Sequence, residues 1–214
     1  MKNNICKTLY LTAAVAAMLL PAAAQTTATA PTTTPTDSAT GKPLTINQRK
    51  ENQQDRIAQG LQSGQLKAGG AANLETKESN LNKEEKLMRS EDNGKLTSAD
   101  KSALTQQQNQ ISNQIYQDKH NAAVQNTDPK SEVGKRAENQ QDRIAQGVKS
   151  GQLTAGEAAN LERKETNLNK EVAADRNANG GKLTQDEKNY VNQQQNKVSK
   201  QIAKDKHNSF RQKP

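Results

Sequence analysis

Two histidines occupy equivalent places in this chain and could do chemistry. His120 and His207 each stand in the sequence Asp-Lys-His-Asn. A histidine that acts as a general base or a metal ligand needs partners, but no cysteine, second histidine or serine-nucleophile motif lies near either one. Each histidine precedes an asparagine at the expected end of a helix, where a cation and a capping residue are favoured. We therefore predict two helix-capping histidines and a protein that is not an enzyme.

Positive charge near the C-terminus could hold an anionic partner. The formal net charge is +8, and six cations stand close together against the single acid Asp205: Lys197, Lys200, Lys204, Lys206, Arg211 and Lys213. An anionic polymer of the cell envelope could dock on such a surface. Nucleic acid is a poorer match because no groove-entering motif or aromatic stacking platform accompanies the charge. A solvated basic tail is the alternative interpretation, and the residues leave both open.

An oxygen-rich stretch before the last expected helix resembles the EF-hand calcium loop. It reads Asp175-x-Asn177-x-Asn179-Gly180-Gly181-Lys182-Leu183-Thr184-x-x-Glu187. The resemblance implies calcium ligands from the side chains of Asp175, Asn177, Asn179 and Glu187. The stretch is one residue longer than that loop, and the matching loop of the first half has Met88 in the place of Asp175. A capped helical turn explains the same residues without metal, so weak calcium binding is predicted only as an alternative.

The elements that must position these residues come from a duplication. Residues 51–121 align with residues 138–208 at an offset of 87 without a gap, and 45 of the 71 aligned positions are identical. A shorter pattern, Gly-x-Leu-Thr-x-x-acid, begins at Gly94, Gly151 and Gly181, with a degraded copy at Gly64. In such a turn the glycine ends one helix. The threonine and the acid three residues later form a capping box that starts the next helix.

These turns and the spacing of apolar residues predict an all-α fold of two tandem three-helix modules, residues 44–125 and 131–210. The expected helices are Ile46–Leu61, Ala68–Arg89 and Ser98–Lys119, then Val133–Val148, Ala155–Arg176 and Gln185–Lys206. Only 30% of the residues are hydrophobic, so we expect thin cores and modules that splay or settle only against each other or a partner. The glutamine runs at 106–110 and 193–195 are either solvated faces or contacts between helices.

The first 43 residues predict export. Residues 1–24 combine a basic start, the apolar run Thr8–Leu20 and Ala22-Ala23-Ala24, the order of a signal peptide cleaved after Ala24. The run is too short to span a bilayer, which takes about 20 residues, so we expect no membrane span after cleavage. Residues 25–43 are rich in Thr, Ala and Pro and predict a disordered linker. Removal of Cys6, the only cysteine, would leave a mature protein without a thiol or disulfide.

Four segments together resemble a group of exported bacterial proteins with tandem helical repeats: Glu-Asn-Gln-Gln-Asp-Arg-Ile, Ser-Gly-Gln-Leu-Thr, Asn-Gly-Gly-Lys-Leu-Thr and Asp-Lys-His-Asn. The resemblance covers residues 46–208 and implies export and helical repeats, but no activity. We therefore expect a periplasmic or secreted, non-catalytic protein that binds an unidentified protein or an anionic envelope polymer. Weakly bound calcium is the only cofactor that the residues suggest.

Overall fold

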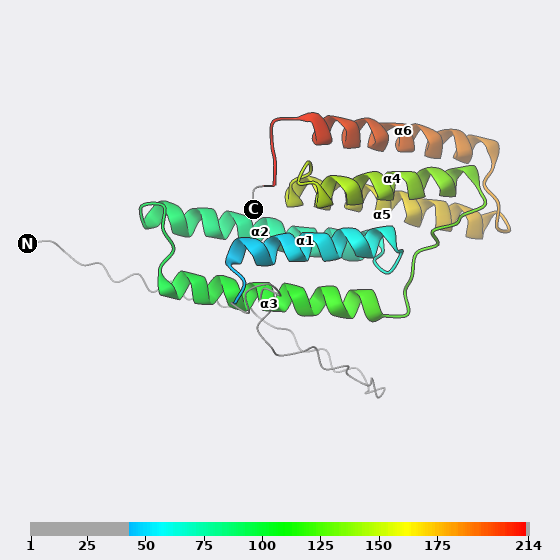
Figure 1. Ribbon diagram of the computed structural model, residues 1–214. Helices are drawn as coiled ribbons and strands as arrows, with labels where there is room; N and C mark the ends of the chain where they lie inside the picture. Colours follow the sequence, from blue (N-terminus) through cyan, green and yellow to red (C-terminus); the bar gives the residue numbers. More distant parts are fainter. Residues whose placement is uncertain (1–42, 213–214) are drawn as a thin grey trace, which may run out of the picture. The chain divides into compact units, whose positions relative to one another are not determined.

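The computed structural model describes residues 43–212, which form six helices and no β-strand. The helices are α1 (Ile46–Gln62), α2 (Ala68–Glu91), α3 (Ser98–His120), α4 (Glu132–Lys149), α5 (Ala155–Ala178) and α6 (Gln185–His207) (Figure 1). The all-α fold with three helices in each half is confirmed. Each helix extends one or two residues beyond its predicted C-terminal end, and α4 also begins one residue earlier than predicted. The predictions for the signal peptide, for residues 25–42 of the linker and for Lys213 lie outside the described residues.

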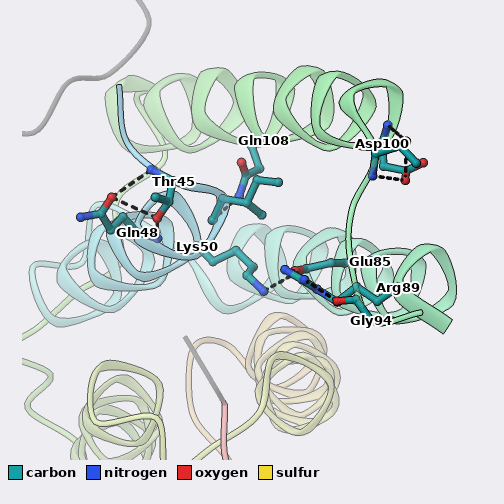
Figure 2. Close-up of polar contacts among 10 residues, drawn as sticks. Thr45, Gln48, Lys50, Glu85, Arg89, Gly94, Asp100 and Gln108 are labelled. Carbon is teal, nitrogen blue, oxygen red and sulfur yellow. Dashed lines mark hydrogen bonds and ion pairs between the residues drawn. The ribbon is translucent and has the colours of Figure 1, made fainter. Parts of the chain in front are cut away.

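Capping boxes start most of the helices, because a side-chain oxygen and an acid or amide satisfy amides that have no partner within the helix. The three predicted boxes are present at Thr97, Thr154 and Thr184. Thr45 makes a fourth with Gln48, which the sequence analysis missed because glutamine stands in place of the acid. Figure 2 shows the bonds between Thr45 and Gln48. The degraded copy starts α2 at Lys67 without a side-chain cap.

Each half of the chain packs as a three-helix module. Helix α3 packs on α1 and α2, and α6 packs on α4 and α5. The modules also pack on each other, α2 against α5 and α1 against α4. One hydrophobic cluster crosses this join and includes residues of all six helices, among them the fully buried Ile57, Leu74, Ile115, Ile144, Leu161 and Ile202. The modules therefore settle against each other, one of the two arrangements expected of such thin cores.

Helices α2 and α5 run antiparallel across the join. Near the start of α2, a Cβ built on Gly69 lies 3.6 Å from the Thr166 side chain of α5. The equivalent contact, from Gly156 near the start of α5 to Ser79 of α2, is 3.2 Å. The duplication offset of 87 relates the two contacts, so a local twofold axis relates the modules. It crosses near Leu74 and Leu161, midway between the contacts. We call the surface where α1 and α2 meet α4 and α5 the seam.

Candidate functional site

The two histidines end their helices, as predicted. His120 is the last residue of α3 and His207 the last of α6, and both are exposed. In each ring Nδ1 lies 2.7 Å from a carbonyl oxygen four residues earlier, that of Tyr116 or Ala203. The His120 ring also stacks on Tyr116. All of these contacts lie within one helix and are those expected of residues that close a helix end.

The oxygen-rich stretch forms a helix stop and start. Helix α5 continues to Ala178, so Asp175 and Asn177 lie in its last turn and not in a loop. Asn179 is the C-cap residue, and its side-chain Nδ2 donates to both carboxylate oxygens of Glu187 at 2.8 and 2.9 Å. Glu187 also accepts from the Thr184 amide at 2.7 Å, a bond that lowers its pKa. In residues 43–212 no three His, Cys, Asp or Glu side chains gather in a way that could hold a metal ion.

The basic residues near the C-terminus do not all lie on one surface. Lys197, Lys200 and Lys204 are exposed along α6. Arg211 lies beyond the helix, where its guanidinium donates to the carbonyl oxygens of Asn208 and Phe210. Lys206 differs from the others because its half-buried side chain reaches α4, where its Nζ lies 3.4 Å from the carbonyl oxygen of Arg143.

Arg143 also lines a basic groove between α4 and α6, with a volume of about 570 Å³. The groove is lined by Lys130, Glu132, Lys135, Arg136, Asn139, Gln140, Arg143 and Ser199. Lys130 is paired with Asp128. Within the described part of the chain, no carboxylate lies within ion-pair distance of Lys135, Arg136 or Arg143. The groove therefore holds more positive charge than its own residues neutralise.

Neutral groups on α6 hold the two groove arginines. Arg136 donates to the side-chain oxygens of Asn192 at 3.2 Å and Asn196 at 2.5 Å. Arg143 donates from Nη2 to the carbonyl oxygen of Ser199 at 3.2 Å. These bonds fix the guanidinium groups without neutralising them, so their charge stays available to a ligand.

A pair of like charges adjoins the groove. Burial, and then the positive charge of Arg143, lower the pKa of Lys206. The first module has the same pair: Arg56 donates to the Ser112 carbonyl oxygen at 3.1 Å, and burial and Arg56 lower the pKa of Lys119. Two neighbouring cations destabilise a fold unless an anion binds them. Neither pair was predicted from the sequence, although the identical segments 51–60 and 138–147 contain their arginines.

Buried glutamine side chains form hydrogen bonds between the helices of each module. They decide whether the glutamine runs are solvated faces or contacts between helices. Gln108 and Gln195 are buried, and each donates at 2.8 Å to a backbone carbonyl, that of Ile46 or Val133. Gln53 of α1 donates to the Gln108 carbonyl oxygen at 2.6 Å, and Gln140 repeats this bond to Gln195 in the second module. One glutamine of each run is therefore a contact between helices.

Four glutamates that the sequence did not single out are fully buried at the seam. They are Glu75 and Glu78 of α2 and the equivalent Glu162 and Glu165 of α5. Gln54 donates to Glu75, and Gln141 to Glu162, each at 3.0 Å. Burial raises the pKa of Glu75, Glu78 and Glu165 to about 8 and that of Glu162 well above its ordinary value. These groups therefore favour the neutral acid form.

A buried ion network lies beside this cluster in the first module only. Figure 2 shows Glu85 between Lys50 and Arg89, with nitrogen-to-oxygen distances of 2.7 Å to each. Burial alone would raise the pKa of Glu85, but hydrogen bonds from the two cations outweigh it and lower the pKa. Ala137 and Val172 take the places of Lys50 and Glu85 in the second module, so this network is a local structural feature and not a repeated site.

No helix within residues 43–212 has the length and apolarity needed to cross a membrane. No family model, curated protein or solved structure matches the chain. The groove and the seam are therefore interpreted from the residues and geometry of this chain alone.

Proposed function

We propose that the protein is an exported, non-catalytic helical protein that binds an anionic ligand in the groove between α4 and α6. The observation that carries the proposal is the Arg143–Lys206 pair, which adjoins Lys135 and Arg136 without a carboxylate partner in the described residues. The N-terminal sequence supports export. A periplasmic or secreted protein meets the anionic polymers of the cell envelope, which are the partners that its charge suits.

The groove suits phosphate or carboxylate groups. A guanidinium presents a planar fork of donors that matches both groups, and such charge-assisted hydrogen bonds are stronger than neutral ones. The volume of about 570 Å³ lies within the range of small-molecule sites, so the groove could hold one small ligand or a few units of a polymer. Its lining includes one hydroxyl, Ser199, which accepts from the Gln140 amide at 2.9 Å.

The proposal is tested by titrating the protein with tripolyphosphate and with citrate by isothermal calorimetry. The variant Lys135→Gln/Arg143→Gln removes two positive charges from the groove. A hydrogen bond to a charged group contributes about 1.5–3 kcal/mol, so we expect binding to weaken at least about tenfold. We also expect the affinity of the unaltered protein to fall as salt is added, because screening weakens such contacts.

A matched control separates the groove from the overall charge. Lys77→Gln/Lys164→Gln removes the same charge from exposed, equivalent positions of α2 and α5. This control should keep its affinity within about twofold. Equal losses in the two double variants would show that net charge alone attracts the anion. Failure of the unaltered protein to bind either probe would also overturn the proposal.

A further inference from the structure

The buried glutamates form one cluster around the local twofold axis. Glu75 and Glu162 follow the axial residues Leu74 and Leu161, and Glu78 and Glu165 lie about one helical turn further along. All four are 0% exposed. The charge of Glu75 acts on both Glu78 and Glu162, so the carboxyl groups of the two modules lie close enough to repel each other when ionised.

The cluster has acceptors without donors. Neither oxygen of Glu78 or Glu165 has a hydrogen-bond partner, and one oxygen of each of Glu75 and Glu162 also lacks one. The side-chain oxygens of Gln54 and Gln141, which adjoin the cluster, also have no hydrogen-bond partner. Among the described residues, every buried side-chain nitrogen or oxygen that lacks a hydrogen-bond partner is an oxygen. A protonated carboxyl supplies an O–H donor to such a layer, whereas a carboxylate only adds another acceptor.

The cations near the seam are engaged elsewhere. Arg163 of α5 donates to the Thr76 hydroxyl of α2 at 3.2 Å, and the buried Arg49 of α1 donates to the Asn109 side chain at 3.3 Å. Lys50 of α1 acts on Glu78, but its Nζ is bound to Glu85. Helix α4 has Ala137 at the position equivalent to Lys50. Helix α3 has no buried charged residue, and the only buried charged residue of α6 is Asp205, which accepts from the Gln201 side chain at 2.7 Å. Ionised glutamates at the seam would therefore be buried charges with little compensation.

We propose that the seam is a proton-controlled clasp, in which the modules hold together while the four glutamates carry protons and separate as these protons are lost. Each pKa is raised from 4.5, to about 8 for Glu75, Glu78 and Glu165. Docking is therefore strongest below pH 4.5 and weakens as the pH rises toward 8. Between these values each glutamate lowers the ratio of docked to separated modules by up to about tenfold per pH unit.

The first experiment follows the melting temperature of the full chain carrying Cys6→Ser from pH 5 to pH 8.5. We expect a large fall over this range. Glu78→Gln/Glu165→Gln removes two of the four ionisable groups with almost no change of shape and should reduce the fall by about half. The control Glu84→Gln/Glu171→Gln, at equivalent and partly exposed positions, should keep it. A flat profile for the parent chain, or an unchanged fall in Glu78→Gln/Glu165→Gln, would overturn the proposal.

The second experiment locks the seam and does not depend on the glutamine variant. In the Cys6→Ser chain, Ser79→Cys/Gly156→Cys places two thiols at the contact where a Cβ on residue 156 lies 3.2 Å from the Ser79 Oγ, a spacing that suits a disulfide. Small-angle scattering then measures the radius of gyration. At pH 8.5 the oxidised form should stay compact and the reduced form should expand, while at pH 5 both should be compact. Identical radii for both forms at pH 8.5 would refute the clasp.

Discussion

Gly60 is a buried glycine in α1 at which an added methyl group has no room. A Cβ built there lies 2.6 Å from Cδ1 and 2.7 Å from Cγ of Leu66. Leu66 cannot move away easily, because it is 1% exposed and its amide donates to the Gly60 carbonyl oxygen at 2.8 Å. The duplication repeats this contact between Gly147 and Leu153, with both distances at 2.6 Å. Substitution to alanine at either glycine should therefore overpack the core.

Two effects of opposite sign decide how much Gly60→Ala changes the free energy of unfolding. Alanine in place of glycine inside a helix stabilises it by about 1 kcal/mol, because the unfolded chain loses freedom. Overpacking a core costs about 1–3 kcal/mol. Carbon atoms pack best at about 3.5–4.0 Å, so contacts of 2.6 and 2.7 Å require Leu66 to shift. We therefore expect Gly60→Ala to lower the free energy of unfolding by about 1 kcal/mol, the difference between about 2 and 1.

Gly70 of α2 provides the matched control. A Cβ at this position lies 3.7 Å from Leu66 Cδ2 and 3.8 Å from Asp118 Oδ2, both ordinary contacts. Gly70→Ala should therefore raise the free energy of unfolding by about 0.5 kcal/mol. Urea unfolding followed by circular dichroism measures both variants. In a helical body of this size, Gly60→Ala should also lower Tm by about 2–4 °C.

The decisive result is whether each glycine-to-alanine variant raises or lowers the free energy of unfolding. If Gly60→Ala is as stable as the parent chain or more stable, the packing of Leu66 against α1 is not as tight as described. If Gly147→Ala behaves differently from Gly60→Ala, the two modules do not share this contact. Unequal denaturant slopes would indicate a change in the surface exposed on unfolding and would require calorimetry to compare the variants.

Three further predictions follow from single contacts. Thr154→Ala removes the hydroxyl that caps α5 and should cost about 1 kcal/mol in urea unfolding; an unchanged midpoint would contradict the capping role. Lys50→Met leaves buried Glu85 with Arg89 alone and should cost about 3 kcal/mol at pH 7. That loss should shrink as the pH falls through the lowered pKa of Glu85, because a protonated Glu85 needs no cation; a pH-independent loss would point to packing instead. Millimolar calcium should leave Tm unchanged, because Thr184 and Asn179 already occupy the Glu187 carboxylate. A rise that Asp175→Asn abolishes would establish the EF-hand-like alternative.

The helices and their turns could be predicted because their causes are local. Glycine and the threonine that follows it set the end of one helix and the start of the next within a few residues, as at Gly181 and Thr184. Leu74 and Leu81 fall on one stripe of α2, and both are buried. Because the duplication repeats these local signals, the three helices of each module could be predicted without knowing how the modules pack.

The groove depended on tertiary structure. Lys206 was a candidate because other cations stand near it in the chain, but its neighbour in the fold is Arg143, 63 residues earlier. The identical segments 51–60 and 138–147 marked the arginines as repeated residues. Sequence spacing could not show that α4 carries Arg143 to α6, since that pairing arises when three helices pack around one core.

The seam was decided mainly by packing. Glu75 flanks the apolar stripe of α2, where charged side chains usually lie in water. Glu78 stands on the stripe itself, four residues after Leu74 and three before Leu81, and this spacing is the one sequence signal for its burial. Both are buried because α5 covers this side of α2, and α5 does so because two thin cores exclude more water together than apart. Local sequence thus determined where each helix begins and ends. The docking of one module on the other decided which of their charged residues lost contact with water.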